Sequence, residues 1–74
     1  MTKPKYNRIK AALSEAGKTA GALGVFMGVH KSTVSDWCTN SNQPSVQDLY
    51  RIAAFLGLDH PAELLVPAKQ VDAP

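Results

Sequence analysis

The sequence has little of several features that mark other classes of protein. Its single cysteine, Cys38, excludes an internal disulfide and a zinc cluster built from cysteines. The longest strongly apolar stretch, Ala22–Val29, has eight residues, far fewer than the roughly 20 that span a membrane. No apolar run follows the charged N-terminus, so we expect no secretory signal and predict a cytoplasmic protein.

The chain is also short and only mildly charged. Its 74 residues predict one small domain with a shallow core, too small for a large catalytic cleft. The formal net charge is +2, but residues 1–37 carry six basic and two acidic residues, whereas residues 38–74 carry two basic and four acidic ones. The N-terminal half therefore either faces an anionic partner or presents a solubilising basic arm.

The spacing of apolar residues predicts an all-α fold of five short helices and no strand. Tyr6, Ile9 and Leu13 share one face of a first helix over residues 6–16. Thr19 is a good N-cap for a second helix that ends at Met27 before Gly28. A third helix is predicted over residues 31–38, capped by His30 or Ser32, with Val34 and Trp37 facing inward.

The second half of the chain predicts two further helices. Ser45 and Asp48 have the spacing of a capping box at the start of a helix over residues 46–56, which Gly57 ends. A short fifth helix follows, in which Pro61 suits the first turn and Leu64 and Leu65 point to the core. Around this domain of residues 6–66 we expect a loose basic arm over residues 1–5 and a tail over residues 67–74.

Two positions have a specific backbone requirement. Gly24 lies inside a predicted helix, where glycine costs about 1 kcal/mol, so we expect a neighbouring helix to approach it closely. Asn40 lies in a polar loop over residues 39–44 and is the residue there that most readily adopts a left-handed conformation.

The helices around Gly28 have the pattern of a helix-turn-helix. Thr19–Met27 and Lys31–Cys38 are joined by the three residues Gly28-Val29-His30. The pattern Thr19-x-x-x-Leu23-Gly24-x-x-Met27-Gly28-Val29-x-x-Ser32-Thr33-Val34-Ser35-x-Trp37, followed by Leu49, Ile52-Ala53, Leu56-Gly57-Leu58 and Glu63-Leu64-Leu65, resembles the phage repressor-like family, also called Cro/XRE. The resemblance covers about residues 6–66.

This resemblance implies a compact five-helix, lambda-repressor-like domain that binds double-stranded DNA. It implies a small transcriptional regulator, most simply a repressor, that acts as a homodimer and reads the major groove with residues 31–38. The positions that match the base-reading residues of the family are Lys31, Ser32, Thr33, Ser35 and Asp36. Lysine can donate to guanine, serine to either base type, and aspartate can accept from cytosine.

Phosphate contacts are expected at the start of the second helix and in the loop after the third. The candidate residues there are Thr19, His30, Asn40, Ser41, Asn42 and Gln43. Two lysines are added to this set, Lys5 from the basic arm and Lys10 from the first helix. The two lysines are either a phosphate clamp or simply solvated. The expected dimer contacts are Leu58, His60, Leu64, Leu65 and Val66. Because this surface is small, we expect the dimer to form stably only on DNA.

An alternative reading is a protein–protein interaction module, of antitoxin or adaptor type, on the same scaffold. Val25 and Phe26 stand where the family usually has polar residues, and an apolar pair on a helix exterior is either a partner surface or a packing adjustment. We expect neither a metal nor a cofactor, because His30 and His60 lie 30 residues apart in the sequence with no cluster of carboxylates. We expect no enzymatic activity, because no nucleophile has a base partner at a suitable spacing.

Overall fold

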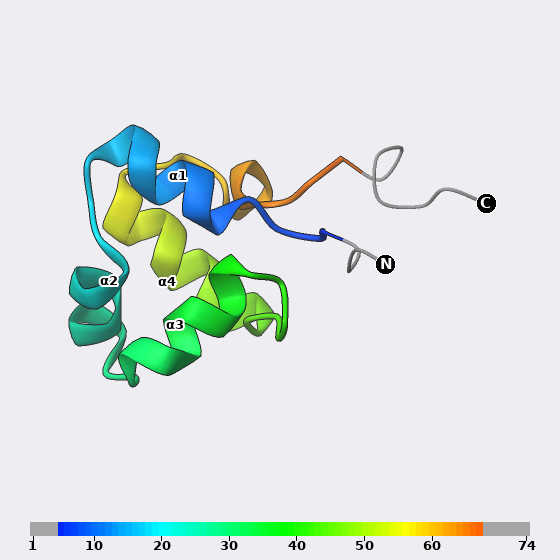
Figure 1. Cartoon of the computed structure of the whole chain (residues 1–74). Coiled ribbons are helices and arrows are strands. Elements are labelled where there is room, and N and C mark those ends of the chain that lie inside the picture. The colour runs from blue at the N-terminus through cyan, green and yellow to red at the C-terminus, as the bar shows by residue number, and fades with distance from the viewer. Residues whose placement is uncertain (1–4, 68–74) are drawn as a thin grey trace.

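A computed structural model describes residues 5–67 of the chain. All but Lys5 of the arm predicted over residues 1–5, and all but Pro67 of the tail predicted over residues 67–74, lie outside the described part. The elements in chain order are α1 (Ile9–Ala16), α2 (Ala20–Met27), α3 (Lys31–Cys38), α4 (Val46–Leu56) and η1, a 3-10 turn (Pro61–Leu64). Figure 1 shows α1 across the top of the bundle and α3 along its lower side. Within residues 5–67 no helix is long and apolar enough to cross a membrane.

The core confirms the inward faces predicted for most of the helices. α2 packs against α3 on one side and α4 on the other, α1 packs against both α3 and α4, and η1 packs against α4. The buried apolar side chains come from every element and are Ile9, Ala12, Leu13, Leu23, Met27, Val34, Trp37, Ile52, Ala53, Leu56 and Leu64. Cys38 is half-buried against this core, as predicted for a filler residue.

The predicted caps of α2, α3 and α4 are present. Thr19 Oγ1 accepts a hydrogen bond from the Ala22 N–H at 3.1 Å, and His30 Nδ1 accepts one from the Ser32 N–H at 3.2 Å. At α4 the Ser45 hydroxyl accepts from the Asp48 N–H while the Asp48 carboxylate accepts from the Ser45 N–H, which is a complete capping box.

The first helix begins later than predicted. α1 starts at Ile9 rather than residue 6, and Tyr6 lies outside the helix with 48% of its surface exposed. The reason is that residues 6 and 7 make other backbone contacts: the Val66 N–H donates to the Tyr6 carbonyl at 2.9 Å, and Asn7 forms an isolated antiparallel bridge with Leu65. Tyr6 is therefore not part of the helical apolar stripe that its spacing suggested.

The expected fifth α-helix is a single 3-10 turn. η1 has four residues, and the chain after it is extended at Leu65, where it pairs with the N-terminal segment instead of continuing as a helix. The Glu63 carboxylate accepts a hydrogen bond from the His60 N–H at 3.1 Å and so closes the turn. The fold therefore has four α-helices and a 3-10 turn within residues 5–67, with no strand beyond the single bridge.

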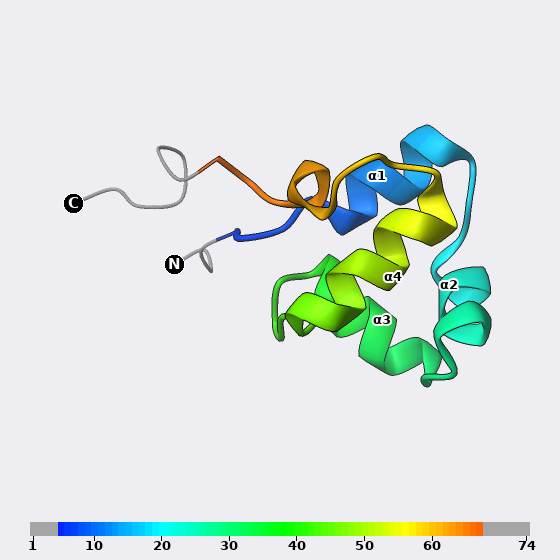
Figure 2. The ribbon, with the colours of Figure 1, turned by 180° about the vertical axis from the view of Figure 1, so that it is seen from behind.

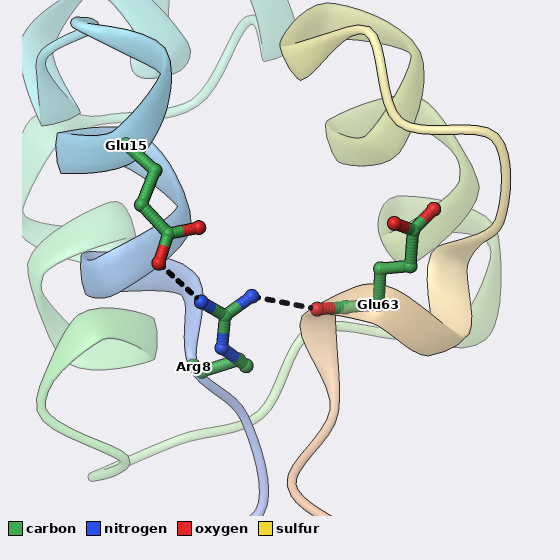
Figure 3. A network of polar contacts seen from close by, with 3 residues as sticks. All are labelled: Arg8, Glu15 and Glu63. Carbon is green, nitrogen blue, oxygen red and sulfur yellow. Dashed lines mark hydrogen bonds and ion pairs between the residues drawn. The ribbon is translucent and has the colours of Figure 1, made fainter.

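Arg8 joins the start of α1 to η1. Its guanidinium donates to the Glu15 carboxylate at 2.7 Å and to the Glu63 backbone carbonyl at 3.0 Å, while the Glu63 carboxylate points away from it (Figure 3). The Arg8 N–H also donates to the Leu64 carbonyl at 2.8 Å. The two ends of the domain are thus held together by backbone and side-chain contacts of one residue.

Candidate nucleic-acid interface

The turn between α2 and α3 has the geometry of a helix-turn-helix. Gly28 ends α2 with a left-handed backbone at φ 72°, which costs glycine little. The Val29 N–H then donates to the Gly24 carbonyl at 3.0 Å, and His30 caps α3. These contacts fix the angle at which α3 leaves α2.

Gly24 has the close neighbour that the sequence predicted. A Cβ at this position would lie 3.1 Å from the Val29 carbonyl oxygen, 3.7 Å from Val34 Cγ2 and 3.8 Å from Lys31 Cα. The side of α2 at Gly24 therefore faces α3, and the absent side chain allows the two helices to pack tightly.

The five residues proposed to read bases all lie on α3 and are accessible to different degrees. Lys31, Ser32 and Ser35 are exposed, whereas Thr33 and Asp36 are half-buried. Ser32 Oγ lies 2.9 Å from His30 Nδ1, so the first turn of α3 is ordered by its own side chains. Lys31 has no ion-pair partner within residues 5–67, where the one salt bridge joins Arg8 to Glu15.

Asp36 is engaged with the loop that follows α3. Its carbonyl accepts hydrogen bonds from the Ser41 N–H at 2.9 Å and the Asn42 N–H at 3.3 Å, and Asn42 Nδ2 lies 3.4 Å from the Asp36 carboxylate. The loop thus closes onto the C-terminal end of α3, and the Asp36 side chain is shared between that loop and the exposed face of the helix.

A lysine-lined hollow lies between α1, the start of α2 and α3. It has a volume of about 450 Å³, and three lysines contribute to its wall, one each from α1, the α1–α2 connection and α3. The lining residues are Lys10, Leu13, Ser14, Lys18, Ala20, Lys31, Ser35, Cys38 and Thr39. The free N–H groups at the N-terminus of α2 add a partial positive charge at Ala20, beside the same hollow.

Lys18 was not among the residues predicted from the sequence. Its place directly before the N-cap Thr19 is a usable signal, because a side chain there lies beside the first turn of the following helix. Lys10, which was predicted, lines this hollow and also a second one of about 420 Å³ whose wall includes Lys5. The structure therefore brings Lys5, Lys10 and Lys31 to one connected region of surface.

Asn40 has the predicted left-handed backbone, with φ 61°, but its side chain faces inward. Only 9% of the residue is exposed, and Oδ1 accepts hydrogen bonds from the backbone N–H groups of Tyr6 at 2.9 Å and Asn7 at 3.0 Å. Gln43 donates to the same oxygen and accepts from Asn7 Nδ2 at 2.7 Å. The amides of Asn40 and Gln43 thus fix the N-terminal segment. Asn40 is the buried member of the predicted loop set, whereas Ser41, Asn42 and Gln43 are exposed.

The residues predicted for a dimer contact are divided between core and surface. Leu64 is completely buried within the protomer, which confirms that it points to the core and corrects its assignment to the dimer contact. The prediction that Leu65 also points to the core was wrong, because the chain is extended at Leu65 and pairs there with Asn7. Leu65 is 41% exposed and His60 is exposed, whereas Leu58 and Val66 are half-buried.

Cys38 lies at the boundary of both hollows. Burial raises the pKa of its thiol, and the positive charge of Lys10 partly opposes that increase. The shift favours the protonated thiol, which suits a side chain that packs against the core. Within residues 5–67 no group of three or more histidine, cysteine, aspartate or glutamate side chains is placed to hold a metal ion.

The fold and this turn define a helix-turn-helix domain, and a family model described as Helix-turn-helix matches residues 9–62. The chain belongs to this family, of the Cro/C1 type that is also called XRE. A solved structure, described as a "putative DNA-binding protein" from Bacteroides fragilis, is similar with a TM-score of 0.80 and 39% sequence identity, over 82% of this chain and 97% of that one. No curated protein matches the chain significantly.

Proposed function

We propose that this chain binds double-stranded DNA as a small transcriptional regulator, with α3 in the major groove. The observation that carries the proposal is the exposed polar face of α3 beside a lysine-lined hollow at the N-terminus of α2. Cations and free helix N–H groups at this place suit the phosphate backbone, whereas the side chains of α3 suit base edges. The family match and the similar solved structure support the same function.

The residue roles divide into two groups. Lys31 and Ser32 in the first turn of α3 would donate to bases, and Asp36 would accept from a cytosine amino group. Lys5, Lys10 and Lys18, with the backbone at Ala20, would contact phosphates without reading sequence. Thr19 would act through its capping of that helix end.

The first test is selection of bound sites from random duplexes, followed by binding measurements at several salt concentrations. We expect one preferred sequence, and an affinity that falls steeply as the salt concentration rises, because phosphate contacts release counterions. Lys31→Ala should relax the preference at one base pair, and Lys5→Ala should weaken binding to all sequences alike. Failure to retain any duplex at low salt would contradict the proposal and favour the interaction module.

We further propose that two copies bind a two-fold site and repress by covering a promoter. Half-sites would then lie about 34 Å apart, one turn of DNA. The candidate contacts between copies no longer include Leu64, which is buried. They are Leu65, His60 and the accessible parts of Leu58 and Val66. Leu65→Glu should abolish cooperative binding to two half-sites and leave binding to one half-site intact; equal cooperativity in both proteins would contradict this arrangement.

A further inference from the structure

Two aromatic rings and two cations form a row across α2 and α4. The rings of Phe26 and Phe55 have centroids 4.9 Å apart. Lys18 Nζ lies 5.0 Å from the centre of the Phe55 ring, and Arg51 Cζ lies 5.9 Å from the centre of the Phe26 ring. Arg51 also approaches the Phe26 carbonyl, with Nη2 at 3.5 Å. We call Lys18, Phe55, Phe26 and Arg51 the aromatic–cation row.

The row is exposed at Lys18, Phe26 and Arg51, whereas Phe55 is half-buried against the core, and the charges of the row are not neutralised. Phe26 is 45% exposed, and the adjacent Val25 is 85% exposed, the highest value among the large apolar residues that are described. Neither Lys18 nor Arg51 has an ion-pair partner within residues 5–67. An exposed apolar patch with a free cation at each end is thus left without a partner in the protomer, and contiguous apolar surface of this kind marks interaction sites.

Apart from Lys18, which also lines the lysine-lined hollow, this surface is separate from the face proposed to read DNA. Gly24 faces α3, whereas Phe26, two residues later and so on the far side of α2, packs against α4. Figure 1 has α3 on the viewer's side of α4, and the reverse view of Figure 2 has α4 in front. Phe26 and Arg51 are also absent from the wall of the lysine-lined hollow.

We propose that the aromatic–cation row, with Val25, is a docking site for an acidic amphipathic helix of another protein. Apolar side chains of that helix would cover Val25 and Phe26, and its carboxylates would pair with Arg51 and Lys18 at the two ends. Arginine that is already stacked on a ring is held in place, so it loses less freedom when it binds a carboxylate. The two cations therefore require a partner with carboxylates, just as the exposed patch requires one with apolar side chains.

A second copy of this chain does not suit the same surface. A two-fold contact would place the Lys18 and Arg51 cations of one copy against those of the other, and like charges in an interface are costly. The DNA duplex supplies anions but offers no apolar surface along its phosphates to cover Val25. An acidic, partly apolar protein segment satisfies both features.

The test uses the full chain and a fluorescent synthetic peptide with leucine and phenylalanine on one helical face and glutamate along both edges. We expect a saturable rise in fluorescence anisotropy with the unmodified protein. Phe26→Ser and Arg51→Glu should each weaken binding by about tenfold or more, as truncation of a central aromatic or arginine contact does. Lys31→Ala removes a cation from the other face and should bind the peptide like the unmodified protein.

Two controls separate docking from folding. Thermal unfolding shows whether Phe26→Ser still folds, and Val25→Ser alters a residue so exposed that folding should be unaffected while peptide binding weakens. A peptide with lysine in place of glutamate should not bind. Failure of the acidic peptide to bind, or equal binding by Arg51→Glu, overturns the proposal.

Two further results would assign the surface to another occupant. Displacement of the peptide by saturating duplex DNA, beyond the weakening that Lys18→Ala alone produces, would show that the row belongs to the DNA interface. A dimer that Arg51→Glu abolishes in sedimentation would show that the row joins two copies of the chain. The proposal does not depend on the DNA-binding function: duplex binding by Val25→Ser should equal that of the unmodified protein, so the two proposals can fail separately.

Discussion

Gly24 and Gly21 lie three residues apart in α2, yet their surroundings give opposite predictions for alanine. At Gly24 a Cβ would meet the Val29 carbonyl at 3.1 Å, and this carbonyl belongs to a turn that is hydrogen-bonded to Gly24 itself. Overpacking of that kind costs about 1–3 kcal/mol, against a gain in helix propensity of about 1 kcal/mol. We expect Gly24→Ala to lower the free energy of unfolding in urea titrations.

Gly21→Ala is the matched control, because the nearest atom to its Cβ would be Thr19 Oγ1 at 4.0 Å. Here the gain in helix propensity is unopposed, so the free energy of unfolding should rise by up to about 1 kcal/mol. Equal effects of the two substitutions would contradict the close approach of α2 and α3 at Gly24.

Asn40 affects stability in two ways, through its left-handed backbone and through its side-chain hydrogen bonds, and two substitutions distinguish the two effects. Asn40→Gly keeps the left-handed backbone but leaves the N–H groups of Tyr6 and Asn7 without their acceptor, at a cost of about 1–3 kcal/mol for an unsatisfied buried group. Asn40→Ala adds a left-handed strain of about 1–2 kcal/mol. Chemical denaturation should therefore rank the alanine variant below the glycine variant; the reverse order would mean that the backbone strain is not significant.

The Cys38 thiol gives a prediction for pH. Its pKa is raised by burial in the folded chain, so its contribution to stability is complete below the pKa of the unfolded thiol and is lost as the pH rises through the higher folded value. At neutral pH we expect slower alkylation by iodoacetamide in the folded than in the unfolded protein. Lys10→Ala should slow it further, since Lys10 favours the thiolate, whereas Lys31→Ala serves as the control.

At the scale of elements, η1 contributes to the core although it is only one turn long. Leu64→Ala should lower the free energy of unfolding by about 2–5 kcal/mol, because the side chain is completely buried. Leu65→Ala, at the next residue and 41% exposed, should change it by only about 0.5 kcal/mol. Thermal or urea unfolding measures both; similar losses in the two variants would contradict the assignment of Leu64 to the core.

The elements also show which parts of the fold are readable from sequence. Local signals placed α2, α3 and α4 correctly, because Thr19, Ser45 and the terminal glycines act on neighbouring residues. The predicted start of α1 was wrong because residues 6 and 7 pair with residues 65 and 66, more than 50 positions away. The spacing of apolar residues contains no information about such contacts. The same pairing ended the expected fifth helix after one turn.

The candidate site follows the same division. The exposed residues of α3 are readable from the spacing of the inward-facing Val34 and Trp37. The inward position of the Asn40 amide could not be predicted, because a polar residue in a polar loop does not indicate that its side-chain oxygen accepts hydrogen bonds from the distant backbone of residues 6 and 7. Nor does the spacing of Phe26 and Phe55, on two helices, show that their rings meet.

At the scale of the whole molecule, the cations fall on two faces with different predicted partners. Lys10 lines both hollows beside α3, whereas Arg51 stacks on Phe26 across α4. Because each phosphate contact contributes about 0.9 to the slope of log affinity against log salt, Lys10→Ala should reduce the magnitude of that slope by about 0.9 per protomer. Arg51→Ala removes the same charge from the other face and should leave the slope unchanged. Fluorescence titrations of one duplex at several salt concentrations measure both slopes, and an equal reduction in the two variants would mean that DNA affinity follows total charge rather than the placement of lysines around α3.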